Sequence, residues 1–301
     1  LLEEPPAYQT VLKEKLKAGL SYPTASAAAL ISYFDDPALN ETISQPNNIL
    51  GIYYMKALMK RKSTIKPYTL LRCGSHYHEE MLGSKSDVGE AEILSSARSI
   101  RHSIASDLPL SEIADHIPAQ VLQLLVQHQG QSFPITTDDF TAVLGYRLLN
   151  EMNKGFTDYI DVSENLSDRI VKEVGHYRSL SDFIDLLKTK DFTHARISRC
   201  LMHIMLGMQN ETLADYIRSD YIAYARPLGF RNDSVTLLSA AKEHTSIPLL
   251  GKLADAKNIL SPKAYAMLQE DIYASHVYQL AVAQKFHTTF SHEYQRRIIK
   301  I

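Results

Sequence analysis

The later part of the chain is a succession of helical apolar patterns with almost no strand signal between them. From about residue 106 onward, apolar side chains recur at helical spacing in segments such as AQVLQLLVQHQ, DDFTAVLGYRLLNEMN and AYAMLQEDIYASHVYQLAVAQKF. Recurrence at intervals of three and four residues is typical of helices that bury one face. The pattern therefore predicts an all-helical domain over residues 106–301, with YIAYARPLGF as the one candidate for extended structure.

The first part of the chain has a mixed pattern. SYPTASAAALISYF offers a helix face of small residues suited to close packing. A nearly all-apolar helix is expected from about Ile49 to Lys62, and such a helix is typically buried on more than one side. STIKPYTLLR then predicts a short strand that ends near Arg72. A helix followed by a strand is half of an α/β unit, so we predict part of an α/β domain over residues 1–105 and a predominantly helical chain overall.

Charge and composition exclude several classes of protein. The chain has 32 Lys and Arg against 34 Asp and Glu, so any nucleic-acid binding must use a local basic patch. The two cysteines, Cys73 and Cys200, form no CxxC motif, which indicates a reducing, cytoplasmic setting without a disulfide framework or a cysteine zinc site. Because no apolar stretch approaches the ~18 residues of a membrane span, we expect no transmembrane segment.

Two adjacent asparagines, Asn47 and Asn48, precede the apolar helix. Asparagine is disfavoured inside helices and favoured at their caps. The pair therefore has two interpretations at this point. It either caps the helix or presents two amide side chains to a ligand.

The segment SSARSIR, residues 95–101, has the features of an anion site. Ser95 or Ser96 can cap a helix whose first-turn N–H groups point outward, and Ser99 can add a hydroxyl. Arg98 and Arg101 are three residues apart, near one face, where they can clamp a phosphate. The alternative is a capped surface helix with solvated arginines. Arg72 favours the phosphate site, because the carboxyl ends of strands in open α/β sheets face the ligand crevice.

A local excess of positive charge occurs in KTKDFTHARISR, residues 188–199. A helical wheel separates an apolar stripe (Ile197, Leu201, Ile204 and Met208) from a basic ridge that includes His203. The cations in question are Lys188, Lys190, Arg196 and Arg199. Such charges are usually a solvated face, but a ridge beside a Lys-x-Lys loop also suits contacts with a phosphate backbone.

Two further segments carry weaker signals. HYH, residues 76–78, lies in a polar loop over residues 73–93 that we expect to be mobile, but no third ligand occurs at a suitable spacing, so no metal site is predicted. Arg296, Arg297 and Lys300 form a smaller basic cluster, which is equally well explained as a frayed tail.

Taken in order, these motifs resemble one family. The segments QPNNILGIYYMKAL, KPYTLLR, YH, LSSARSIR and KTKDFTHARISRCLMHIMLG follow the order seen in bacterial tRNA(Met) cytidine acetate ligases, within the HIGH-type nucleotidyltransferase superfamily. The resemblance is clearest from residue 9 to about residue 208. SSARSIR matches the Ser-x-x-x-Ile-Arg phosphate motif of the superfamily, and NNILG upstream makes the match more specific.

The resemblance implies an activity and a site. The enzyme would activate acetate with ATP as acetyl-adenylate and transfer the acetyl group to N4 of the wobble cytidine, C34, of elongator tRNA(Met). The α/β part would be a partial Rossmann-like nucleotidyltransferase domain. Mg²⁺ would accompany ATP without an assigned protein ligand, and the helical domain would hold the tRNA. The residues implied at the ATP site are Asn47, Asn48, Arg72, Ser96, Ser99 and Arg101.

Catalysis of adenylation needs positioning and positive charge rather than a covalent intermediate. Arg72 and Arg101 would neutralise the charge that builds on the departing pyrophosphate. The family also begins with a strand and a His-Asn-Gly-His signature that have no counterpart in these 301 residues, so we expect the chain to hold the second half of the nucleotide-binding domain. Two alternatives stay open: another nucleotidyltransferase that makes a small-molecule adenylate or dinucleotide, and a non-catalytic helical RNA-binding or scaffold protein. The oligomeric state is not indicated.

Overall fold

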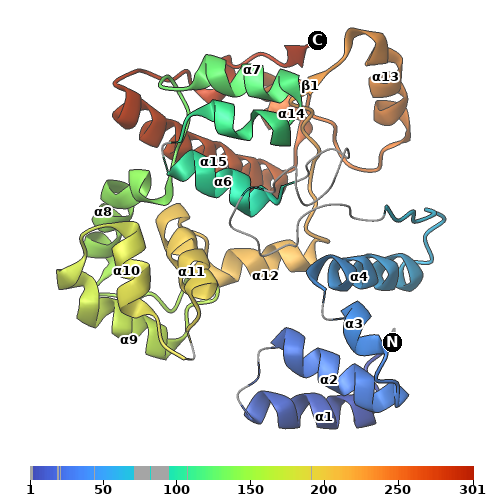
Figure 1. Cartoon of the computed structure of the whole chain (residues 1–301). Coiled ribbons are helices and arrows are strands. Elements are labelled where there is room, and N and C mark those ends of the chain that lie inside the picture. The colour runs from blue at the N-terminus through green and yellow to red at the C-terminus, as the bar shows by residue number, and fades with distance from the viewer. Residues whose placement is uncertain are drawn as a thin grey trace. The chain divides into compact units, whose positions relative to one another are not determined.

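The computed structural model describes residues 3–18, 20, 22–43, 45–70, 82, 95–106, 108–190 and 192–301. It divides into two compact units, Leu1–Ile117 and Pro118–Ile301 (Figure 1). The domain boundary expected from the sequence, between residues 105 and 106, lies at the end of a helix inside the first unit. That assignment stays a prediction, and each unit is described separately below.

The first unit is helical in its described residues. Its elements are α1 (Pro6–Lys17), α2 (Tyr22–Phe34), α3 (Leu39–Ile43), α4 (Pro46–Lys60), α6 (Ala97–Ala105) and the 3-10 helix η1 (Leu110–His116). Helices α1 and α2 lie side by side (Figure 1). Their shared core consists of Tyr8 and Leu12 from α1 against Ala25 and Ala29 from α2, both of which are fully buried. The expected small-residue packing face is confirmed, because alanines four residues apart let the neighbouring helix approach closely.

The prediction that the apolar helix is buried on more than one side is wrong for α4. Leu50 is 55% exposed, Tyr54 65% and Met59 58%. The helix packs against α3, and its side chains Ile49, Ile52 and Tyr53 line a pocket, whereas its opposite face has no packed neighbour among the described residues. Apolar composition alone indicated burial, but burial also needs an element on each side of the helix.

The strand predicted from STIKPYTLLR is not formed in the described residues 63–70. Ile65 is 68% exposed, Tyr68 88% and Leu70 97%. β-Propensity depends on packing against neighbouring strands, and no partner strand lies beside this segment in the part of the chain that the structure describes. The segment leads into residues 71–81, which lie outside the described ranges.

The second unit holds a helical bundle and a smaller C-terminal part. Its first helices are α7 (Ala119–His128), η2 (Thr137–Phe140), α8 (Thr141–Glu151), α9 (Glu164–Glu173), η3 (Val174–His176), α10 (Leu180–Leu187), α11 (His194–Leu206) and α12 (Asn210–Arg218). Helices α8 to α11 gather into one bundle (Figure 1) around a core that includes Leu148, Phe156, Phe183 and Leu201, each no more than 1% exposed. This bundle confirms the helical pattern predicted after residue 106.

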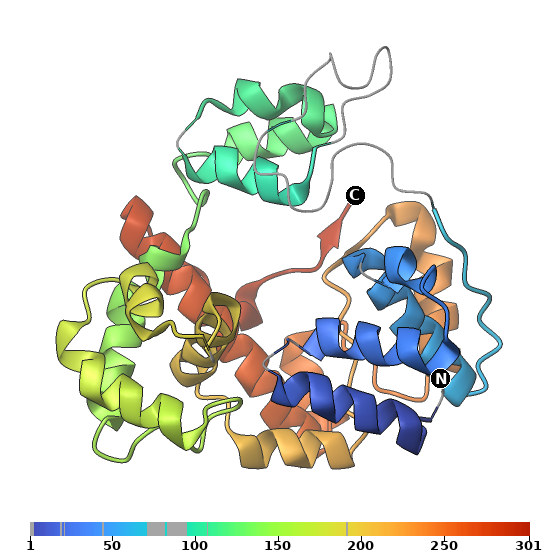
Figure 2. The same cartoon turned by 60° about the horizontal axis from the view of Figure 1, so that its bottom comes forward.

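The remaining elements include a second, smaller core of buried residues between Leu250 and Ile272. They are β1 (Gly229–Phe230), η4 (Asn232–Ser234), α13 (Val235–His244), η5 (Leu253–Asp255), α14 (Ala256–Ile259), α15 (Pro262–Phe286), η6 (Glu293–Gln295) and β2 (Ile299–Lys300). The C-terminal segment follows α15 and ends in the short arrow of β2 (Figure 2). β2 pairs in parallel with β1. Extended structure therefore occurs at the end of YIAYARPLGF, as the sequence indicated, and the C-terminal basic cluster belongs to a paired segment rather than a frayed tail.

Among the described residues, no helix has the length and apolar character needed to cross a membrane.

Candidate functional site

The structure separates the roles of the two adjacent asparagines. Gln45, with extended backbone, is the N-cap of α4 and Pro46 is its first residue, so the cap interpretation of the Asn pair is wrong. Asn48 Nδ2 donates a hydrogen bond of 3.0 Å to the carbonyl of Thr42, which ties the start of α4 to α3. Asn47 lies one position earlier in the same turn and is exposed. Within the described ranges, a hydrogen bond is recorded for the side chain of Asn48 and none for that of Asn47, so Asn47 is the better candidate for a ligand contact.

The start of α6 is a capped helix turn, as the serine pattern indicated. Ser96 is the N-cap, and its Oγ accepts a hydrogen bond of 3.0 Å from the backbone N–H of Ser99. Ser99 Oγ donates to the carbonyl of Ser96 at 2.8 Å, and Ser96 Oγ donates to Ser99 Oγ at 3.2 Å. Both side chains are buried, with 2% and 0% exposure. The two hydroxyls shape the turn, and for either to serve as a phosphate ligand it must rotate; that role stays a prediction.

Positive charge accompanies this helix start. Arg98 and Arg101 are both exposed on α6. The N-terminal end of a helix carries partial positive charge and outward N–H groups, which favour an anion. Ser95 Oγ lies 2.8 Å from His116 Nδ1, which connects the cap to η1. This turn therefore has the charge and the backbone rigidity expected of a phosphate site.

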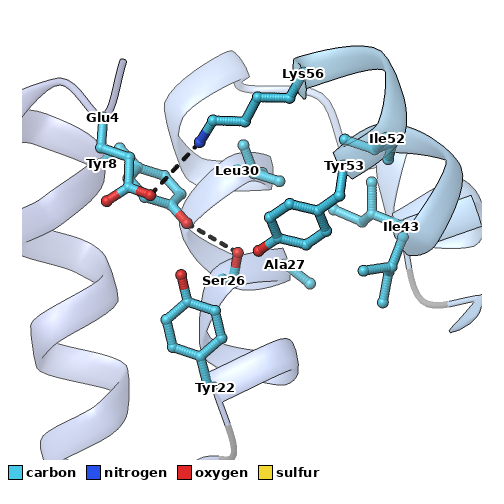
Figure 3. Close-up of a pocket in the computed structure, with 11 residues that line it drawn as sticks. Glu4, Tyr8, Tyr22, Ser26, Ala27, Leu30, Ile43, Ile52, Tyr53 and Lys56 are labelled. Atoms are coloured by element: carbon cyan, nitrogen blue, oxygen red, sulfur yellow. Dashed lines mark hydrogen bonds and ion pairs between the residues drawn. The ribbon is translucent and has the colours of Figure 1, made fainter. Parts of the chain in front are cut away.

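A pocket of about 140 Å³ lies among α1, α2, α3 and α4 (Figure 3). Tyr8 and Ser26 form a hydroxyl–hydroxyl hydrogen bond of 2.9 Å at its wall. Lys56 Nζ and Glu4 Oε1 are 3.8 Å apart at its edge. Burial, followed by the neighbouring Tyr53, raises the pKa of the Tyr22 hydroxyl to about 12. The Tyr22 hydroxyl therefore stays protonated and uncharged near neutral pH.

Sequence reasoning missed this pocket. The sequence of α4 does contain one wall of the pocket on a single helix face. That face carries Ile49, Ile52, Tyr53 and Lys56 together with Asn48. The wall also needs Tyr8 from α1, and no local pattern shows that Tyr8 and Tyr53 meet. The pocket therefore could only be found once the packing of four helices was known.

Several predicted residues lie outside the described ranges. They are Arg72, the HYH motif at residues 76–78 and, apart from Leu82, the polar loop over residues 73–93. Helix α4 packs against α3 and α6 packs against η1. Convergence of Asn47, Arg72 and Arg101 on one nucleotide stays a prediction. The described residues contain no cluster of three side chains suited to hold a metal ion.

The basic ridge of α11 is partly neutralised. Arg199 Nε donates to Asp161 Oδ2 at 2.7 Å, and the guanidinium of Arg196 lies 5.1 Å from the ring centre of Phe192. His203 Nδ1 is 2.9 Å from the carbonyl of Ile160, so it serves the fold. Lys188 and Lys190 are exposed.

The predicted apolar stripe of α11 is correct except at its end. Ile197, Leu201 and Ile204 are fully buried. Met208 follows the end of the helix and is 39% exposed, because α11 stops at Leu206 and Gly207 adopts a left-handed conformation. Met205 takes the place expected of Met208 in the core.

Comparison with known proteins decides the family. The family model described as HIGH Nucleotidyl Transferase matches residues 1–293. The chain belongs to this family. It is 33% identical over 279 residues to the tRNA(Met) cytidine acetate ligase of Clostridium novyi strain NT, a match that covers 90% of this chain and 67% of the relative. The ligase of the same name from Caldanaerobacter subterraneus subsp. tengcongensis is 33% identical over 283 residues, covering 93% and 66%.

The HIGH nucleotidyl transferase assignment agrees with the fold. Crystal structures of Thermotoga maritima TmcAL superpose with TM-scores of 0.82 for the apo form and 0.81 for a form bound with alpha-thio ATP. They are 23% and 22% identical and cover 100% and 99% of this chain, which spans 72% and 71% of theirs. The predicted class, part of an α/β nucleotidyltransferase domain followed by a helical domain, is confirmed, as is the resemblance to tRNA(Met) cytidine acetate ligases. The chain spans about two thirds of the length of the curated relatives it matches.

Proposed function

We propose that this chain is part of a ligase that activates acetate with ATP and acetylates N4 of the wobble cytidine, C34, of elongator tRNA(Met). The observation that carries the proposal is the 33% identity to tRNA(Met) cytidine acetate ligases over 90% of the chain. The alpha-thio ATP bound in the similar Thermotoga maritima structure supports ATP as the nucleotide.

In this proposal, the start of α6 binds the phosphates of ATP. The capped first turn is rigid, and the exposed Arg101 supplies positive charge beside it. Attack of the acetate oxygen on the α-phosphorus forms acetyl-adenylate and releases pyrophosphate, whose developing charge Arg72 and Arg101 stabilise. Asn47 orients the nucleotide from α4. The amine of cytidine N4 then attacks the acetyl carbon, which releases AMP and a proton.

Magnesium fits this chemistry without a protein site. Mg²⁺ retains several waters and is commonly held through substrate phosphates. No set of three ligands occurs among the described residues, so we assign it no side chain.

We further propose that Lys188, Lys190, Arg196 and Arg199 contact the phosphate backbone of tRNA in the cytoplasm. Lys188 and Lys190 support this because they are exposed on the segment that leads into α11. Thr193 caps that helix by accepting from the N–H of Arg196. Arg199 would exchange its partner Asp161 for a phosphate.

The experiment is an acetylation assay with the natural gene product that carries these residues. We expect isotope-labelled acetate and ATP to yield labelled N4-acetylcytidine in elongator tRNA(Met) transcripts, measured by mass spectrometry of nucleosides. A transcript with uridine at the wobble position is the matched control. Adenylate formation without any tRNA product would favour the small-molecule nucleotidyltransferase instead, and tRNA binding without adenylate formation would favour a non-catalytic RNA-binding protein.

A further inference from the structure

A basic groove of about 850 Å³ lies in the second unit, and none of its lining residues belongs to α11. One wall is formed by residues 226–228 and 250–254, and the other by residues 293–300. From the sequence alone, the cations of the second wall are explained equally well as a basic cluster or as a frayed tail. Their arrangement in the structure indicates a binding surface.

The first wall is fixed by backbone hydrogen bonds. The N–H of Ala225 donates to the carbonyl of Pro248 at 2.9 Å, and the N–H of Leu250 donates to the carbonyl of Ala225 at 2.8 Å. Arg226 directly follows the bonded Ala225, and Lys252 lies two positions after the bonded Leu250. They are therefore carried by a backbone that is held in place.

The second wall is anchored at both ends. At one end, Glu293 is buried, accepts from Ser275 Oγ at 2.5 Å and from Arg226 at 2.9 Å, and lies 3.2 Å from Arg296. At the other end, Ile299 and Lys300 pair with Gly229 and Phe230. A Cβ on Gly229 would lie 3.0 Å from the carbonyl oxygen of Ile299, so a larger residue there would require the paired segment to shift slightly. Arg297 lies between the two anchors.

The groove is strongly positive although the chain as a whole has a formal net charge of −2. Its lining contains five cationic side chains and one carboxylate, Glu293, which is already paired with Arg226 and Arg296. In the part of the chain that the structure describes, no ion pair is recorded for Lys252, Arg297 or Lys300. These three lining charges therefore have no recorded carboxylate partner there, and Lys300 Nζ lies 5.7 Å from the ring centre of Phe230.

An aromatic ring completes the groove. Tyr294 lines it and is 37% exposed. The Tyr294 hydroxyl accepts from Gln269 Nε2 at 2.9 Å and lies 3.2 Å from the hydroxyl of Tyr265. The ring is thus held by its far end, and the ring of His292 lies against it, with centres 5.3 Å apart and planes tilted by 31°. The exposed part of the Tyr294 ring is the surface offered for stacking.

We propose that this groove binds an unpaired segment of RNA, with Lys252, Arg297 and Lys300 on phosphates and a base stacked on Tyr294. The inference rests on the proposed function, which supplies a tRNA with unpaired anticodon bases. Proteins that bind single-stranded nucleic acid combine cations placed along its phosphate backbone with exposed aromatic rings on which bases stack. A concave surface with its charges in a recess suits a nucleic-acid strand better than a flat anionic membrane.

The first test is the triple variant Lys252→Ala, Arg297→Ala and Lys300→Ala. Its matched control is Lys172→Ala, Lys242→Ala and Lys257→Ala, which removes three exposed lysines of the same unit that do not line the groove. The probes are an elongator tRNA(Met) transcript and its anticodon stem-loop, measured by filter binding from 50 to 300 mM salt. At about 100 mM salt, we expect the groove variant to bind about 10- to 100-fold more weakly, with a salt slope reduced by about two.

A second pair of variants separates stacking from charge. Tyr294→Leu removes the ring and should weaken binding about 5- to 50-fold with an unchanged salt slope, whereas Tyr294→Phe keeps the ring and should bind nearly as the unmodified chain does. Thermal unfolding checks that each variant is folded. If the triple variant is unstable, Lys252→Ala with Arg297→Ala, neither of which has a recorded partner, replaces it.

Three outcomes would overturn the inference. They are equal RNA affinity of the groove and control variants, no RNA binding by the unmodified chain, and groove-dependent binding of phosphatidylserine vesicles without RNA binding. If N4-acetylcytidine forms but the groove substitutions leave tRNA affinity unchanged, the inference fails while the proposed function stands. If the groove substitutions weaken RNA binding but no N4-acetylcytidine forms, the proposed function fails while the inference stands.

Discussion

The two adjacent asparagines show how neighbouring residues of one type acquire different roles. Asn48 shares a helix face with Ile52 and Lys56, and its amide bonds back to Thr42. Both asparagines are exposed, but Asn47 is turned by about 100° around the helix axis and has no side-chain hydrogen bond recorded among the described residues. The sequence could indicate that amides occur at this helix start but not which of them faces the fold.

Substitution of each asparagine should therefore have a different effect. We expect Asn48→Ala to lower the free energy of unfolding by about 1 kcal/mol, because it removes the tie between α3 and α4. We expect Asn47→Ala to leave stability within about 0.5 kcal/mol and to weaken ATP binding about 5- to 10-fold. Thermal unfolding and nucleotide titration measure the two effects, and equal loss of stability in both variants would contradict the separation.

Glu293 is a buried carboxylate of the C-terminal part with a shifted pKa. Burial raises the pKa of Glu293, but the hydrogen bonds from Ser275 and Arg226 and the charge of Arg296 outweigh burial, so its pKa is lowered. A carboxylate with a lowered pKa in the folded state stabilises the fold above its unfolded pKa of about 4.3. That contribution is lost as the pH falls through the folded value.

The variant Glu293→Gln tests this ionisation. At pH 7 we expect a loss of about 2 kcal/mol in the free energy of unfolding, because Arg226 is left partly buried without its carboxylate. The difference between the variant and the unmodified chain should shrink as the pH falls from about 5 toward 3, since protonation removes the same charge from the unmodified chain. Chemical denaturation at several pH values measures this; a difference that stays constant with pH would show that Glu293 does not act through its charge.

At the scale of the element, α6 is the helix on which the proposed nucleotide site depends. Ser96 caps it, and a cap substitution to alanine typically costs about 1 kcal/mol. We expect Ser96→Ala to lower the free energy of unfolding by that amount. Ser106→Ala, at the exposed end of the same helix, should change it by no more than about 0.5 kcal/mol.

Ser96→Asp should keep the cap and the stability but weaken ATP binding, because its charge repels phosphate. If Ser96→Asp binds ATP as tightly as the unmodified chain, the proposal of a phosphate site at the start of α6 is contradicted.

Prediction from sequence succeeded where local pattern was sufficient. Helical periodicity predicted α8, α10 and α11 correctly because each helix buries one regular stripe of apolar side chains. The serine pattern predicted the cap of α6. It failed for residues 63–70 and for the burial of α4, because strand pairing and the packing of a second helix face depend on elements elsewhere in the chain. The groove was missed for the same reason, since residues 293–300 of one wall lie far along the chain from residues 226–228 and 250–254 of the other.

At the scale of the whole molecule, the two units divide the proposed reaction between them. The first holds the described candidates for the ATP site, Asn47 and the α6 turn with Arg101. The second holds both basic surfaces proposed for tRNA, the exposed cations near α11 and the C-terminal groove. Adenylation and tRNA binding should therefore respond to different substitutions.

Acetate-dependent exchange of labelled pyrophosphate into ATP, measured with the natural gene product and its Arg101→Ala variant, tests the central claim most directly. The account predicts exchange that requires acetate and falls about 100-fold in Arg101→Ala, with His102→Ala, the exposed neighbour on α6, close to the unmodified protein. Exchange without acetate, or full activity in a folded Arg101→Ala variant, would contradict it.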